Sequence, residues 1–75
     1  MFARRKELEF TFHAQKLMFE RFITDEQIAS VLDNPDTGGQ AQLKGCHRAE
    51  RKLGKRTFGV VYQESRKTIK IITVW

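Results

Sequence analysis

The chain has one cysteine, one proline and one tryptophan among its 75 residues. No apolar run approaches the roughly 20 residues that a membrane-spanning helix needs. The first ten residues, MFARRKELEF, carry cations but no continuous apolar stretch behind them, unlike a secretory signal peptide. The single thiol, Cys46, excludes an internal disulfide and, without other thiols near it, disfavours a four-ligand zinc site. These absences predict a soluble protein of a reducing compartment, the cytoplasm.

The composition indicates a folded chain with a small core. Hydrophobic residues make up 40% and include six phenylalanines, which is well above what disordered chains contain. Because most domains have roughly 100 to 200 residues, residues 1–75 are expected to form a single domain.

Positive charge is concentrated in one stretch of the sequence. The formal net charge is +5, and residues 44–56 alone supply that value, with six cations against the single acid Glu50. The six cations are Lys44, Arg48, Arg51, Lys52, Lys55 and Arg56. A folded basic segment attracts polyanions, nucleic acid first. The alternative is a solvated edge strand whose Lys and Arg prevent unwanted strand pairing.

Two helices are predicted between Thr11 and Leu32. Helical spacing places six residues on one arc that we expect to be buried: His13, Ala14, Leu17, Met18, Arg21 and Phe22. Thr24 and Gln27 have the spacing of a capping box, which predicts the start of the second helix. Asn34-Pro35 predicts its end, because the residue before proline is disfavoured in helical conformation.

After Pro35 the pattern becomes that of strands. Residues 36–39 have turn chemistry, and residues 40–43, 46–53, 57–63 and 68–75 are predicted as four strands joined by short turns. Short connections favour an antiparallel meander. Helices followed by strands indicate an α+β domain, with both helices packed on one face of a four-stranded antiparallel sheet.

The run HAQKLMFERFITDEQIASVLDNP, followed by a basic strand pair and then by FGVVYQ and IITVW, resembles a known family. It is similar to a group of small uncharacterised bacterial domains related to the RelE/ParE toxin superfamily. The resemblance covers roughly residues 10–75 and rests on these elements: His13-Ala14, Met18, Arg21, Ile23-Thr24, Asn34-Pro35 and Thr73.

The resemblance implies a compact ααββββ fold of the kind used by metal-independent ribonucleases and by toxins that act on translating ribosomes. Three departures stand out. Leu17 occupies a position where relatives often carry a second helical Arg, and Phe22 one where they usually have Gly. The sequence ends at Trp75, without the extension in which some RelE-type nucleases place catalytic groups.

Metal-free RNA cleavage needs a base, an acid and cations around the phosphate. The candidate catalytic residues are His13, Arg21, Arg51 and Thr73. Imidazole suits the proton transfers because it titrates near neutral pH, but His13 is equally interpretable as a helix-start residue bonded to backbone or solvent. Arg21 either holds a phosphate or pairs with a nearby acid, and Thr73 has the simpler interpretation of a β-branched strand residue.

The candidate RNA-binding residues are Lys44, Arg48, Lys52, Lys55 and Arg56. Strand alternation places Arg48 and Lys52 on one face and Arg51 on the other, where the helices would bring it near Arg21. Tyr62 and Phe58 either stack bases or pack in the core, and His47 is a plain strand residue or a second imidazole.

No Walker loop, Rossmann glycine pattern or carboxylate cluster is present, so neither cofactor nor metal is expected. Three functions stay open. The first is a toxin-like endoribonuclease acting on RNA; the second is a non-catalytic module that binds RNA or a ribosomal surface; the third is an inactive relative whose basic face receives an acidic, antitoxin-like protein.

Overall fold

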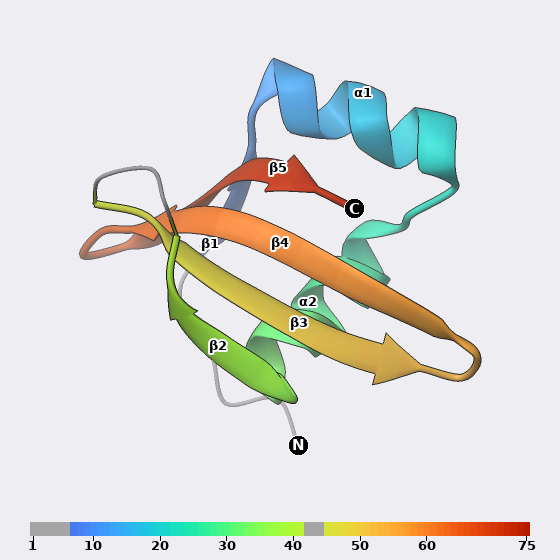
Figure 1. The fold of residues 1–75 in the computed structure, drawn as a ribbon. Helices are drawn as coiled ribbons and strands as arrows, with labels where there is room; N and C mark the ends of the chain where they lie inside the picture. The colour runs from blue at the N-terminus through green and yellow to red at the C-terminus, as the bar shows by residue number, and fades with distance from the viewer. Residues whose placement is uncertain (1–6, 42–44) are drawn as a thin grey trace.

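Two helices and five strands make up the part of the chain that the structure describes, residues 7–41 and 45–75 of a computed structural model (Figure 1). In chain order the elements are β1 (Glu7–Phe10), α1 (Phe12–Arg21), α2 (Asp25–Asp33), β2 (Thr37–Gln40), β3 (His47–Leu53), β4 (Arg56–Glu64) and β5 (Thr68–Val74). The predicted α+β class is therefore confirmed.

The described strands form one mixed sheet in the order β1-β5-β4-β3-β2. Strands β2 to β5 are an antiparallel meander, as expected, but β1 pairs with β5 in parallel, from Glu7 opposite Thr68 to Phe10 opposite Ile71. The predicted four-stranded, wholly antiparallel sheet is wrong in this respect. A strand of only four residues, paired far along the chain, leaves no local turn signal from which it could be predicted.

The position predicted for the first strand of the meander is also wrong. Strand β2 occupies Thr37–Gln40, most of which was assigned to a turn, and residues 42–43 of the predicted strand lie outside the described residues. Asp36 fixes the start of β2, because its backbone N–H donates to the Glu50 carbonyl at 2.8 Å and its carboxylate accepts from the Lys52 N–H at 2.9 Å. These contacts hold two glycines, which have low intrinsic strand propensity, against β3.

Side-chain caps begin both helices. The Thr24 hydroxyl accepts from the Gln27 N–H at 3.1 Å and the Gln27 side chain accepts from the Thr24 N–H at 2.9 Å, so the predicted capping box is confirmed. Thr11 caps α1 by accepting from the Ala14 N–H at 3.1 Å. In the described part of the chain, neither helix has the length and apolar run that a membrane crossing requires.

Both helices cover the same face of the sheet. Helix α2 packs on β3 and β4, and α1 packs on β5 and β1, at the side of the sheet that these two strands form (Figure 1). The core between the layers consists of Ala14, Ile23, Ile28, Val31, Ala49, Phe58, Val60, Ile69, Ile71 and Val74. Burial of this apolar surface is the main force that holds the helices on the sheet.

The predicted buried arc of α1 is wrong at three of its six positions. Ala14 is fully buried and Leu17 and Met18 are half-buried, but His13, Arg21 and Phe22 are exposed. Among the described elements the helix contacts only β5 and β1, so a narrow stripe of side chains suffices to cover them. Three phenylalanines are 85% to 87% exposed: Phe12, Phe19 and Phe22.

Candidate functional site

The sheet face opposite the helices carries two rows of side chains that form the candidate site. Strand alternation places residues next to buried Ala49 and Val60 on this open face. In the first row Thr73 lies opposite Val61, which in turn lies opposite Arg48. In the second row Trp75 and Gly59 exchange both backbone hydrogen bonds, at 2.9 and 3.0 Å, and Gly59 lies opposite Glu50.

His13 lies at the border of this face, in contact with Thr73. The His13 Nε2 atom is 3.4 Å from the Thr73 hydroxyl, although the two residues are 60 positions apart in the sequence. The cap explains the contact, because the Thr11 hydroxyl also lies 2.9 Å from the Ile71 carbonyl and 3.2 Å from that of Ile72. These bonds fix the first turn of α1 against the end of β5. The imidazole itself stays exposed to solvent.

The Trp75 indole lies over Gly59. A Cβ atom at position 59 would overlap Cε2, Cζ2 and Nε1 of the indole, so only glycine leaves room for this ring. A glycine inside a strand often marks such a close approach. Gly59 and Trp75 thus place an aromatic surface on the open face, in the row next to Thr73.

Arg48 connects the two rows. Its Nη2 atom donates to Oε2 of Glu50 at 2.8 Å, and its guanidinium carbon lies 5.2 Å from the centre of the Trp75 ring, within cation-π range. The Arg48 side chain is nevertheless 54% exposed. The guanidinium is therefore held in one orientation while most of its donors remain available to a ligand.

Glu50 is an anion stabilised by its neighbours. The hydrogen bond from Arg48 is the main cause of its lowered pKa, which desolvation opposes; the Arg48 charge, Thr37 and Trp75 lower the pKa further. The Thr37 hydroxyl lies 3.3 Å from Oε1. Beside this carboxylate, a hollow of about 240 Å³ is lined by Thr37, Gly38, Gly39, Arg48 and Glu50.

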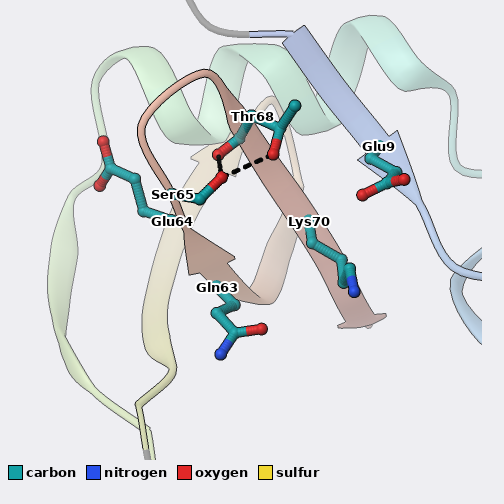
Figure 2. A pocket seen from close by; sticks show the side chains of 6 residues that line it. All are labelled: Glu9, Gln63, Glu64, Ser65, Thr68 and Lys70. Carbon is teal, nitrogen blue, oxygen red and sulfur yellow. Dashed lines mark hydrogen bonds between the residues drawn. The ribbon is translucent and has the colours of Figure 1, made fainter.

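A second hollow, of about 400 Å³, lies near the turn between β4 and β5 (Figure 2). Its lining residues are Glu9, Gln63, Glu64, Ser65, Thr68 and Lys70. Figure 2 shows Ser65 directed at Thr68, whose hydroxyl lies 2.7 Å and whose carbonyl lies 3.1 Å from the Ser65 hydroxyl. These contacts close the turn, and we assign this hollow a structural role.

Arg21 and Arg51 do not join His13 and Thr73. Arg51 lies on the helix-covered face, where its Nη1 atom donates to the Ser30 carbonyl of α2 at 3.0 Å. Arg21 is at the far end of α1, eight residues or about 12 Å along the axis from His13. It makes no hydrogen bond or ion pair with any other residue that the structure describes. The expected approach of Arg51 to Arg21 is wrong, because α1 does not pack on β3.

The predicted RNA-binding residues are divided between surfaces. Arg48 and exposed Lys52 share the open face, as strand alternation predicted, and Lys55 is in the turn after β3. Arg56 lies on the other face, with its guanidinium carbon 4.6 Å from the centre of the Phe58 ring. Lys44 lies outside the described residues. The basic stretch is thus not a single patch.

The two aromatic candidates for base stacking lie on the helix-covered face. Phe58 is a core residue with 2% exposure. Tyr62 is half-buried, which raises the pKa of its phenol, and its ring centre is 5.5 Å from that of His47. The aromatic residue on the open face is Trp75, which sequence reasoning did not select. The glycine between Phe58 and Val60 was the signal for it.

These features define a class: a small α+β domain whose mixed sheet has helices on one face and a polar, partly aromatic site on the other. In the described part of the chain, no three His, Cys, Asp or Glu side chains are grouped as metal ligands would be. Over residues 10–75 the chain matches a family described as a domain of unknown function (DUF4258), and it belongs to that family. No curated protein and no solved structure matches it.

Proposed function

We propose that the protein is a toxin-like, metal-independent endoribonuclease, related to the RelE/ParE superfamily, that acts on RNA along the open sheet face. The contact between His13 and Thr73 is the observation that carries the proposal. It joins a group suited to proton transfer with a strand residue 60 positions away, in the same row as an exposed, oriented guanidinium. Such a combination suits catalysis at a phosphodiester.

In this mechanism the ribose 2′-hydroxyl attacks the adjacent phosphorus. His13 removes the proton from that hydroxyl, the new O2′–P bond forms, and the P–O5′ bond breaks. The products are a 2′,3′-cyclic phosphate and a 5′-hydroxyl, whose proton comes from water or from the imidazolium. Thr73 holds the imidazole ring through Nε2, which leaves Nδ1 for the substrate when Nε2 carries the proton.

The proposal assigns the contact with the phosphate to Arg48 in place of Arg21 and Arg51. Arg48 and Thr73 are separated by β4 alone, or about 10 Å between backbones, so a long side chain can reach the same nucleotide. A guanidinium binds phosphate oxygens through two parallel hydrogen bonds. Lys52 and Lys55 would hold the neighbouring phosphates.

The alternative is a non-catalytic module that binds RNA on the same face. The observation that favours it is the arrangement of Trp75 and Arg48, because stacking and charge suffice to bind single strands without chemistry. An acidic, antitoxin-like protein is a further proposed partner for the basic residues of this face.

Cleavage by His13 variants tests the enzyme. We expect His13→Ala to lower the cleavage rate of ribosome-bound or free RNA by about 10² to 10⁴-fold while RNA affinity changes little. Thr73→Val should lower it less, because the base remains but its orientation is lost. His47→Ala is the matched control, since it removes the other histidine and should retain activity. Intact RNA after incubation with the wild-type protein, with and without ribosomes, would leave only the binding module.

A further inference from the structure

We infer that the hollow beside Glu50 and Arg48 binds a guanine base of the substrate, an inference that rests on the proposed action on RNA. The hollow has a volume of about 240 Å³. Sites for drug-sized ligands have volumes of roughly 300 to 1,000 Å³, so this one suits a single planar base better than a whole nucleotide. Its lining includes Arg48, which is in the row that contains Thr73, so the hollow adjoins the place where the phosphate would be held.

The hydrogen-bonding groups of the hollow favour one base over the other three. Glu50 offers only acceptors and Arg48 only donors. Guanine alone presents two adjacent donors, N1–H and the N2 amine, together with the O6 and N7 acceptors. Its donors match the Glu50 carboxylate. Its acceptors match the two N–H groups of Arg48 that remain when, of the five, one binds Glu50 and two bind the phosphate. Adenine and cytosine offer a single amine to the carboxylate, and uracil a single N–H.

The groups that make these bonds are already held in place in the free protein. Glu50 is kept ionised by Arg48, and Arg48 is oriented by Glu50 and by the Trp75 ring. Gly39 lies opposite Arg48, and a side-chain carbon added there would meet no atom within 4 Å, so this side of the hollow is open. A ligand therefore needs no rearrangement of the strand to enter.

Binding of short 2′-O-methyl RNA tests the inference separately from cleavage, because the blocked hydroxyl cannot attack. Trp75 is the single tryptophan, so its fluorescence reports on binding near the hollow. We expect a hexamer with one guanine in an adenine background to bind about ten-fold more tightly than the all-adenine hexamer. Replacing that guanine by inosine, which lacks the N2 amine, should remove most of the difference.

Glu50→Gln should abolish the preference for guanine, whereas Glu9→Gln, a change of the same charge on β1, should keep it. Equal affinity for the guanine, inosine and adenine hexamers would overturn the inference, and that comparison uses only the wild-type protein. Preference for guanine without cleavage of unmodified RNA would support the inference and refute the enzyme. Cleavage without base preference would do the reverse.

Discussion

Phe22 ends α1 in a backbone conformation that is unfavourable for a residue with a side chain. It ends α1 in the left-handed conformation, with φ 56° and ψ 46°, and lets the Ile23 N–H donate to the Met18 carbonyl at 2.8 Å. A residue with a side chain adopts this conformation at a cost of about 1 to 2 kcal/mol, which glycine avoids. The Phe22 ring is exposed and adds little burial in return.

We therefore expect Phe22→Gly to raise the free energy of unfolding by about 1 kcal/mol, measured by urea denaturation. Phe22→Ala is the control, because it removes the same exposed ring but retains the Cβ atom. If alanine stabilises as much as glycine does, the strain lies in the ring and not in the backbone.

Glu50 gives the open face a dependence on pH. Its pKa is lowered in the folded protein, mainly by Arg48, so its favourable interactions are complete above the ordinary value of 4.5 and are lost as the pH falls through the lower folded value. We expect Trp75 fluorescence to change in that acidic range, before or together with unfolding. In Glu50→Gln this change should be absent; its persistence would assign it to another group.

At the scale of the elements, a comparison of the two threonine caps distinguishes an effect on stability from an effect on the candidate site. Thr11 and Thr24 both cap a helix, but only Thr11 also bonds to β5. We expect Thr11→Val and Thr24→Val each to cost about 1 kcal/mol of stability. Thr11→Val alone should also shift the His13 imidazole resonances in NMR spectra and lower any cleavage, because the bonds that hold His13 beside Thr73 are lost. Equal effects of both variants on His13 would contradict this role.

Local patterns predicted those elements whose signals are local. The capping box, the stop at Asn34-Pro35 and the alternation in β3 each lie within a few residues, and each is present in the structure. Strand β1 depends on a partner that follows much later, and β2 contains two glycines with little strand propensity. The positions of these two strands are set by pairing with other strands, which cannot be predicted from a local sequence pattern.

The candidate site was predictable only in part. His13 and Thr73 came from the resemblance, and alternation correctly placed Arg48 and Lys52 together. Arg51 was assigned to the right face, but its partner is a carbonyl of α2. The position of Trp75 over Gly59 depends on the register of β4 and β5, which contains a bulge between Val61 and Tyr62. A one-residue change in register reverses every face, so this neighbourhood could not be derived in advance.

At the scale of the whole molecule, the net charge of +5 favours the binding of polyanions. The fold places the cations of the basic stretch on different faces, so they should contribute unequally. We expect the logarithm of RNA affinity to fall with the logarithm of salt by about 0.7 per phosphate contact. Replacing Arg48, Lys52 and Lys55 together by Gln should reduce that slope by about 2.

Arg56→Gln is the control for this measurement, because Arg56 lies over Phe58 on the other face and should change the slope little. An unaltered slope in the triple variant would show that these three residues do not contact RNA phosphates. Circular dichroism of each variant verifies that the fold is retained.

The position of β5 between β1 and β4 also determines when β1 can pair during synthesis of the chain. Glu7 pairs with Thr68, which is made sixty-one positions later. At about 5 to 20 residues per second, β1 and α1 wait roughly 3 to 12 seconds for the strand on which they pack. During that interval no partner strand covers Leu8, Phe10 and the inner side of α1. Chaperones that bind exposed apolar segments can therefore bind them before Thr68–Val74 is synthesised.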